Sequence, residues 1–206
     1  MSVPEFHKLY YESRQRTWKN TFWLGYSAEK CPLDLWIYQE ILFETRPDVV
    51  IETGTAAGGS ALFLATIFDV LGSGIVVTID IDEVPSRPVH PRVEYVVGSS
   101  TEETTVERVR TFVRPGLGVM AILDSDHSKD HVLGELRHYG ELVTPGKYLV
   151  VEDTNVNGHP VRPDFGPGPM EAVEEFLAEN EAFEIDPERE KFFMTFNPGG
   201  YLIRRR

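Results

Sequence analysis

The chain is poor in positive charge and has almost no cysteine. It carries 20 Lys and Arg residues against 33 Asp and Glu residues, which gives a formal net charge of −13 at pH 7. A surface of that sign repels a phosphate backbone, so we do not expect nucleic acid as a partner. The single cysteine, Cys31, cannot form an internal disulfide. We therefore expect a packed thiol in a protein of the reducing cytoplasm.

Long apolar runs are absent as well. No stretch approaches the ~18 consecutive apolar residues of a membrane span, and the first ten residues have no apolar signal core. We expect neither membrane association nor an export signal. The length predicts a single domain over residues 1–206, and we expect a helical N-terminal extension over residues 1–46.

The chain does contain a strand, a glycine-rich turn and a helix in direct succession. Val49–Ile51 is apolar without alternation, which is typical of a strand buried on both faces. Gly54 and Gly58 allow a sharp turn close to a ligand, and Ser60 can cap the following helix. The pattern predicts a nucleotide-type cofactor turn, with an ordinary strand-to-helix turn as the alternative.

The spacing within this turn separates two kinds of cofactor. Dinucleotide-binding turns need a second glycine where Ala56 stands, so that pattern fails. The sequence Glu52-x-Gly54-x-x-x-Gly58 instead resembles the first motif of class I S-adenosylmethionine (SAM) methyltransferases. We therefore take Glu52, Gly54, Gly58 and Ser60 as candidate SAM-binding residues.

Strand and helix patterns alternate along the rest of the chain. This order predicts an α/β fold with a mostly parallel seven-stranded sheet and helices on both faces. The resemblance of the glycine turn to the first motif of class I SAM methyltransferases implies that this fold is the Rossmann-like class I methyltransferase fold. Asp34 is the expected N-cap of the helix that precedes the glycine turn. Further strands are expected at residues 75–79, 93–97, 119–123, 148–151, 183–186 and 201–203.

Polar residues follow these strands where ligands of open α/β sheets bind. Asp80 ends the strand after the glycine turn, where a carboxylate can accept both hydroxyl hydrogens of a ribose. Asp82 is the reserve candidate, and a solvated or capping acid is the alternative. Ser99, after the third strand, is placed to contact adenine or ribose.

Three acids follow the next two strands. Asp124 ends one of them, and Glu152 and Asp153 end its expected neighbour. Converging carboxylates repel each other unless a cation lies among them, and oxygen ligands without nearby cysteine favour Mg²⁺ over zinc. The sequence predicts a magnesium site formed by these acids, with structural acids that cap the following loops as the alternative.

His127 lies three residues past Asp124 and is the candidate general base. A surface or capping histidine is the alternative, so this role depends on the metal site. Coordination to a divalent cation lowers the pKa of a bound hydroxyl, and chelation of two adjacent hydroxyls fixes the acceptor oxygen. Together these residues predict metal-assisted O-methylation of a vicinal diol.

Several separated motifs resemble the cephalosporin hydroxylase / rhamnosyl O-methyltransferase family between about Thr21 and Arg204. They are Lys30-Cys31-Pro32-x-Asp34-Leu35-Trp36, Glu52-Thr53-Gly54 through Gly59-Ser60, Leu123-Asp124-Ser125-Asp126-His127-Ser128, Val151-Glu152-Asp153-Thr154, Asn157-Gly158-His159-Pro160 and Phe196-Asn197-Pro198-Gly199-Gly200-Tyr201-Leu202. The resemblance implies a class I methyltransferase fold, SAM, and Mg²⁺ held at Asp124, Glu152 and Asp153. It also implies a histidine base at the position of His127.

The leading hypothesis is a SAM- and Mg²⁺-dependent O-methyltransferase that acts on a rhamnose-like sugar hydroxyl in a glycoside or nucleotide sugar. A catechol-like phenol is the alternative acceptor. A SAM-binding partner subunit of a cephamycin-type methoxylation complex is the non-catalytic alternative. We expect a homo-oligomer, and a lid or disordered flap over residues 154–169. The N-terminal aromatic residues are expected to pack on the core or a partner subunit, with sugar stacking as the alternative.

Overall fold

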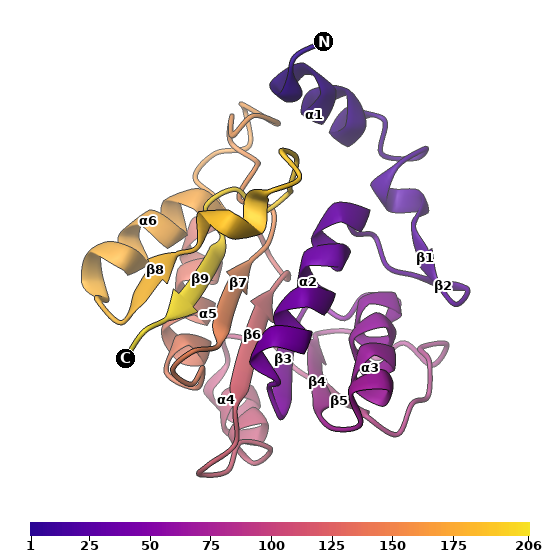
Figure 1. Ribbon diagram of the computed structural model, residues 1–206, viewed down its shortest axis with the longest axis vertical. Coiled ribbons are helices and arrows are strands. Elements are labelled where there is room, and N and C mark those ends of the chain that lie inside the picture. Colours follow the sequence, from indigo (N-terminus) through magenta and orange to yellow (C-terminus); the bar gives the residue numbers. More distant parts are fainter.

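A seven-stranded sheet forms the middle layer of the molecule (Figure 1). The computed structural model describes residues 1–206, and its sheet contains β3 (Val49–Thr53), β4 (Ile75–Asp80), β5 (Val93–Val97), β6 (Val119–Leu123), β7 (Tyr148–Val151), β8 (Phe183–Ile185) and β9 (Tyr201–Arg204). The strands lie in the order β5-β4-β3-β6-β7-β9-β8. The strands from β5 to β7 in this order are parallel, whereas β9 runs antiparallel to both of its neighbours. The predicted mostly parallel seven-stranded sheet is confirmed.

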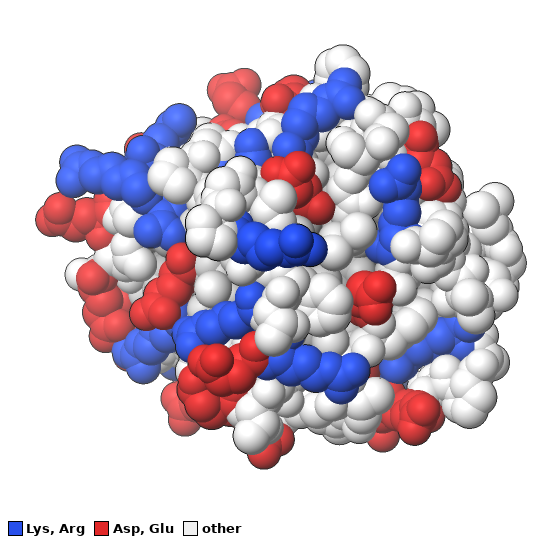
Figure 2. All heavy atoms as spheres, turned by 90° about the horizontal axis from the view of Figure 1, so that it is seen from below, with Lys and Arg blue, Asp and Glu red and all other residues white.

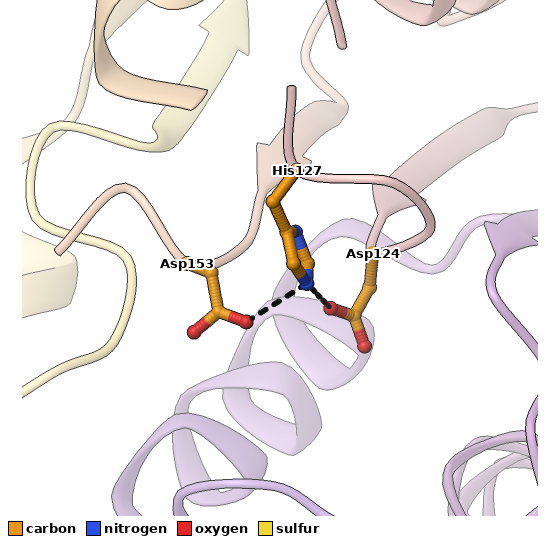
Figure 3. A group of neighbouring side chains, drawn as sticks. All are labelled: Asp124, His127 and Asp153. Carbon is orange, nitrogen blue, oxygen red and sulfur yellow. Dashed lines mark ion pairs between the residues drawn. The ribbon is translucent and has the colours of Figure 1, made fainter. Parts of the chain in front are cut away.

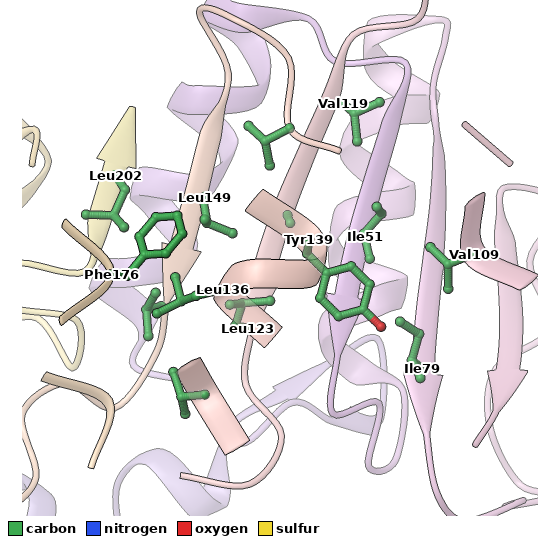
Figure 4. Close-up of a cluster of buried hydrophobic side chains, with 14 of the residues drawn as sticks. Ile51, Ile79, Val109, Val119, Leu123, Leu136, Tyr139, Leu149, Phe176 and Leu202 are labelled. Atoms are coloured by element: carbon green, nitrogen blue, oxygen red, sulfur yellow. The ribbon is translucent and has the colours of Figure 1, made fainter. Parts of the chain in front are cut away.

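Helices cover both faces of the sheet, and their bounds are α2 (Pro32–Thr45), α3 (Gly59–Leu71), α4 (Glu103–Arg110), α5 (Lys129–Gly140) and α6 (Pro169–Glu179). On one face, α2 and α3 pack with Val50 and Met120. On the other, α4, α5 and α6 pack with Ile51 and Ala121, in the cluster that Figure 4 shows in part. Successive residues of β3 and β6 thus enter opposite cores, which is why these strands are apolar without alternation.

The register of the central strands decides which side chains meet at the edge of the sheet. Leu123 ends β6 and pairs with Thr53 of β3 and with Val151 of β7. The next residues along the chain, Asp124 and Glu152, therefore leave the sheet side by side. Carboxylates far apart in the sequence are brought together in this way at the carboxyl ends of the strands.

The N-terminal segment lies beyond this edge of the sheet (Figure 1). It contains α1 (Val3–Glu12), the short 3₁₀ helix η1 (Trp18–Asn20), and a hairpin of β1 (Phe22–Trp23) and β2 (Tyr26–Ser27). The expectation of a helical extension over residues 1–46 missed this hairpin. Its two-residue strands are too short to produce an alternating pattern in the sequence.

Aromatic residues of the N-terminal segment pack on the loop that precedes β9. Phe196 lies in that loop, and the ring centroids of Tyr11 and Trp18 are 5.3 and 5.9 Å from its ring. Cys31 and Met194 are buried in the same small core. Burial raises the pKa of the Cys31 thiol above its ordinary value. The predicted packed thiol is confirmed.

The predicted N-cap role of Asp34 is wrong. Helix α2 begins at Pro32, and Asp34 lies in its first turn with a buried side chain. Its carboxylate accepts hydrogen bonds from Thr195 Oγ1 (2.5 Å), the Phe196 N–H (2.9 Å) and the Tyr201 hydroxyl (2.9 Å). Burial raises the pKa of Asp34 to about 7. Asp34 therefore ties α2 to the C-terminal loop and β9.

The segment after β7, expected as a lid or disordered flap over residues 154–169, is a series of turns tied to the body of the protein. Thr154, Asn155 and Val156 are buried. Asn157 Nδ2 donates to Glu171 Oε1 of α6 at 2.8 Å. The chain continues through α6, β8 and the 3₁₀ helix η2 (Pro187–Glu190) to β9.

The opposite edge of the sheet has a mixed surface. Seen from below, Lys and Arg side chains are interspersed with Asp and Glu (Figure 2). This face therefore shows no patch of a single charge. None of the helices is long and apolar enough to span a membrane.

Candidate active site

A cavity of about 1150 Å³ opens at the carboxyl edge of the sheet. We call the part formed by the turn after β3 and the ends of β4 and β5 the glycine-turn half; Gly54, Thr55, Ala56, Ser60, Asp80 and Ser99 line it. We call the part formed after β6 and β7 the acidic half; Asp124, His127 and Asp153 line it, with Glu152 and Lys30 behind them. The two halves face each other across one space.

Glycines bring the turn after β3 close to its neighbours. Gly54 has a φ of +83°, and a Cβ atom there would overlap the backbone carbonyl of Asp124. Gly58 has a φ of +82° and is the N-cap of α3, with Pro88 packed where a side chain would stand. Both positions require glycine. Only Gly54 lines the cavity, so Gly58 shapes the turn from behind.

Ser60 and Glu52 occupy different depths of the glycine-turn half. The predicted capping role of Ser60 is wrong, because α3 begins at Gly59 and its N-cap is Gly58. Ser60 is buried in the first turn and lines the cavity. Glu52 is buried behind the turn, accepts from Thr78 Oγ1 at 2.6 Å and does not line the cavity. Burial raises the pKa of Glu52.

Asp80 faces the turn from the end of β4. Its Oδ2 accepts from the Ala56 N–H (2.8 Å) and pairs with Arg87 Nη2 (3.1 Å). Its Oδ1 accepts from the Asp82 N–H (3.0 Å). Arg87, which the sequence did not reveal, also donates to the carbonyls of Ala56 and Asp82. The carboxylate is held in one orientation, and Oδ1 keeps a lone pair for a further donor.

Serines and a histidine add polar groups that connect the glycine-turn half with the loop after β6. Ser99 lines the cavity, with its hydroxyl 3.3 Å from that of Thr101. Beside it, His131 Nε2 lies 3.0 Å from Ser100 Oγ and 3.1 Å from Ser125 Oγ. Ser125 stands in one of the sequence motifs, but the sequence did not predict its contact with Ser100 and His131. These residues line the cavity and supply hydrogen-bonding groups next to Ser99.

In the acidic half, Asp124, His127 and Asp153 point toward one another (Figure 3). His127 Nε2 lies 3.1 Å from Asp153 Oδ2 and 3.9 Å from Asp124 Oδ1. One ligand atom from each residue lies within 4.8 Å of the others. At 3.1 Å, one proton must lie between the imidazole nitrogen and the carboxyl oxygen.

Glu152 leaves the sheet beside Asp124 but does not line the cavity. Its Oε1 accepts hydrogen bonds from Lys30 Nζ (2.7 Å) and the Tyr38 hydroxyl (2.9 Å). Lys30 also pairs with Asp124 Oδ2, and its side chain is only 4% exposed. A buried ammonium group therefore stands among the acids that the sequence assigned to a metal. Lys30 begins one of the sequence motifs, but no motif predicted that Lys30 or Tyr38 would contact these acids.

Burial dominates the electrostatics of the acidic half. It raises the pKa of Asp124 and of Asp153, and the charges of Lys30 and His127 oppose these increases. Burial and then the charge of Asp124 raise the pKa of Glu152 to about 7. Burial lowers the pKa of Lys30, but the neighbouring carboxylates outweigh it and hold the pKa above its ordinary value. A cation bound beside these buried carboxylates would stabilise their negative charges.

The donor atoms of this half fit a hard divalent cation. Asp124 Oδ1 and Asp153 Oδ2 are turned to a common point beside His127 Nε2 (Figure 3). Carboxylate oxygens of this kind are the ligands that Mg²⁺ prefers, and no thiolate is near. Glu152 is the third expected ligand, but its Oε1 accepts hydrogen bonds from Lys30 and Tyr38 instead of facing the cavity.

Known proteins are similar to this chain in sequence and in fold. The sequence matches the Rhamnosyl O-methyltransferase/CmcI family over residues 15–205. A protein named Rhamnosyl O-methyltransferase from Mycobacterium tuberculosis is 44% identical, over 98% of this chain and 84% of its own length. A structure of CmcI with Mg and SAM has a TM-score of 0.71 at 19% identity, and the match covers 91% of this chain and 78% of that one.

A structure of the MycE methyltransferase from the mycinamycin biosynthetic pathway, in complex with Mg, S-adenosylhomocysteine (SAH) and mycinamycin VI, is a more distant neighbour. Its TM-score is 0.52 at 21% identity, with 81% of this chain and 42% of that chain covered. The fold is therefore the Rossmann-like fold of class I SAM-dependent methyltransferases. Within that class, the chain belongs to the Rhamnosyl O-methyltransferase/CmcI family. The resemblance seen in the sequence motifs is confirmed.

Proposed function

We propose that the protein is a SAM-dependent O-methyltransferase that methylates a hydroxyl group of a rhamnose-like sugar and uses Mg²⁺ in its acidic half. The observation that carries the proposal is that a glycine-turn half and an acidic half line one cavity. The name of the relative from Mycobacterium tuberculosis supports the sugar acceptor. The Mg and SAM or SAH in the CmcI and MycE structures support the two cofactors.

The glycine-turn half holds SAM. SAM bound there would supply a methyl group on its sulfonium sulfur: the acceptor oxygen would form a bond to the methyl carbon as the carbon–sulfur bond breaks, and SAH would leave. Asp80 accepts hydrogen bonds from the ribose hydroxyls, and its orientation is fixed in advance by Ala56, Asp82 and Arg87. Gly54, Ser60 and Ser99 line the same space, whereas Glu52 and Gly58 hold the turn in shape from behind.

The acidic half prepares the acceptor. Asp124 and Asp153 hold Mg²⁺, with Glu152 next to them as the third acid. Mg²⁺ bound there lowers the pKa of a coordinated hydroxyl. If Asp153 binds the cation, the proton that it shares with His127 Nε2 would be released to solvent. The neutral Nε2 of His127, which lines the cavity, would then take the hydroxyl proton. The proton thus leaves the acceptor oxygen as the oxygen attacks the methyl carbon.

The wall opposite the sheet suits a sugar ring. Tyr11 and Trp18 stack with ring centroids 5.4 Å apart and line the cavity, together with Phe165 from the loop after β7. Aromatic faces bind the apolar faces of sugar rings while polar groups bind the hydroxyls. At about 1150 Å³ the cavity exceeds the ~300–1000 Å³ of ordinary small-molecule sites, so it has room for SAM and an acceptor together.

Mass spectrometry of acceptors incubated with the protein, SAM and MgCl₂ tests the proposal. We expect a gain of one methyl group on a rhamnoside with adjacent free hydroxyls, and little or none on a rhamnoside with those hydroxyls blocked. Preferential methylation of a catechol would move the protein to the phenol alternative. No methyl transfer to rhamnosides, catechols or cephalosporins would favour a SAM-binding partner subunit. The cytoplasmic location and the homo-oligomer stay predictions.

A further inference from the structure

Lys30 is the buried lysine of the acidic half. Lys30 as a whole is 3% exposed, and its ammonium group pairs with Asp124 Oδ2 and with Glu152 Oε1. Those partners lie 94 and 122 positions further along the chain. A lysine is almost never buried unless it is paired, so this contact accounts for the side chain's position.

The main chain of Lys30 is fixed independently of its side chain. Its N–H donates to Thr21 Oγ1 at 3.1 Å, and the Thr21 hydroxyl in turn donates to the Trp18 carbonyl at 2.8 Å. The next residue, Cys31, is buried in the core next to Phe196, and α2 begins at Pro32. The ammonium group therefore reaches the acids from a main chain that is held in place.

The two oxygens of Asp124 have different partners. Oδ2 is held by Lys30, whereas Oδ1 lies on the side of His127, 3.9 Å from Nε2. Glu152 is held in the same way on the side away from the cavity, by Lys30 and by the Tyr38 hydroxyl. Lys30 thus occupies the inner oxygens and leaves Asp124 Oδ1 turned toward Asp153 and His127.

We propose that Lys30 is a positioning residue whose ammonium group is the permanent counter-ion of the acidic half. It holds Asp124 and Glu152 side by side without a metal, and so presents Asp124 Oδ1 to an incoming divalent cation. The proposal rests on the Mg²⁺ site of the proposed function.

The charges around the site explain why such a counter-ion is needed. Asp124, Glu152 and Asp153 are three acids, and Glu52 is a fourth that acts on Lys30 from behind the glycine turn. Without Lys30, Asp124 and Glu152 would be adjacent, desolvated and without a partner of opposite sign on their inner side. Removal of one partner from a buried ion pair is strongly destabilising for that reason.

Thermal unfolding of Lys30→Met in EDTA tests the proposal. Met keeps the length of the side chain and removes its charge, so we expect a midpoint roughly 10 °C below that of the wild type. Millimolar MgCl₂ should raise the midpoint of Lys30→Met more than that of the wild type, because the cation restores positive charge among the acids. A midpoint within 2 °C of the wild type in EDTA, or an equal or smaller Mg²⁺ effect, would overturn the proposal.

A double variant separates charge pairing from simple packing. Lys30→Met/Glu152→Gln removes both charges of the 2.7 Å pair, so it should be more stable than Lys30→Met alone. If the double variant is no more stable than Lys30→Met, or if both variants fail to fold, the counter-ion role is contradicted. Lys129→Met is the matched control, because Lys129 pairs with Glu175 at 2.7 Å on a partly exposed surface away from the cavity and its loss should change the midpoint little.

These measurements contain neither SAM nor an acceptor. A protein that transfers no methyl group but shows the Mg²⁺-dependent rescue of Lys30→Met would refute the proposed function and support the role of Lys30. If the protein transfers methyl groups and Lys30→Met has the thermal midpoint of the wild type, the proposed function is supported and the role of Lys30 is overturned.

Discussion

The glycine-turn half and the acidic half line the same cavity but are stabilised differently. In the glycine-turn half, Asp80 is held by the N–H groups of Ala56 and Asp82 and by Arg87, which stands seven positions further along the chain. In the acidic half, Asp124 is balanced by Lys30, which is 94 positions away. The first half depends on the shape of a local turn, and the second depends on charge balance between distant segments. Substitutions should therefore affect binding of SAM and chemistry on the acceptor separately.

We expect His127→Ala to have the largest effect on methyl transfer and little effect on SAM binding. Loss of the general base should lower methyl transfer by roughly 10²–10⁴-fold. The rise in thermal midpoint on addition of SAM should persist, because His127 belongs to the other half of the cavity. Initial rates and thermal unfolding measure the two effects. His138→Ala is the control, since His138 does not line the cavity, and wild-type rates in His127→Ala would exclude the base role.

Gly54→Ala should damage both halves, because Gly54 is where they touch. The new Cβ atom would meet the Asp124 carbonyl at a residue with a φ of +83°. We expect a loss of about 3 kcal/mol in the free energy of unfolding, measured with urea. Gly72→Ala is a matched control with a φ of +85° and no neighbour within 4 Å, and it should cost only about 1 kcal/mol. Equal losses would show that the contact between the halves is unimportant.

Asp80→Asn should weaken SAM binding without touching the acidic half. Loss of charge-assisted hydrogen bonds to the ribose predicts a Kd about 10- to 100-fold higher by calorimetry. The comparison with Asp82→Asn decides between the two neighbouring acids, which both line the cavity. A larger loss of affinity in Asp82→Asn would transfer the ribose contact to that residue.

The smallest effect concerns α1, which docks on the loop after the acidic half. His7 is buried, its Nε2 lies 2.9 Å from Asn155 Nδ2, and burial lowers its pKa to about 4. Between that value and the ordinary pKa of about 6.5, the unfolded chain binds a proton that the folded chain does not. Stability should therefore fall as the pH drops through this window.

Integration over this window gives a loss of about 2 kcal/mol between pH 8 and pH 5. His7→Gln should lack this component, and urea unfolding of both proteins at the two pH values measures it. If the pH dependence of stability is identical in the wild type and in His7→Gln, protonation of His7 does not contribute to it.

The same difference between the halves decides what the sequence could predict. The glycine turn is contiguous, so the sequence shows its motif and the succession of strands and helices around it. Helix starts were less certain: Ser60 and Asp34 both lie inside the first turn of a helix rather than at its cap. Capping residues and first-turn residues have overlapping chemistry, and the surrounding packing chooses between them.

The acidic half was only partly predictable. Strand ends indicated that Asp124, Glu152 and Asp153 would converge, because parallel strands end at one edge of the sheet. The ammonium of Lys30 and the hydroxyl of Tyr38 reach these acids only through tertiary packing of α2 and the segment before it. No spacing rule connects positions so far apart, so the structure was needed to find them.

The central claim is that SAM binding and metal-dependent chemistry belong to separate halves of one cavity. The most direct test measures SAM affinity by calorimetry and methyl transfer to a rhamnoside in the same preparation, first with EDTA and then with excess MgCl₂. The account predicts that SAM binds in both conditions, whereas methyl transfer stops in EDTA and returns with Mg²⁺. Full methyl transfer in EDTA would contradict the account.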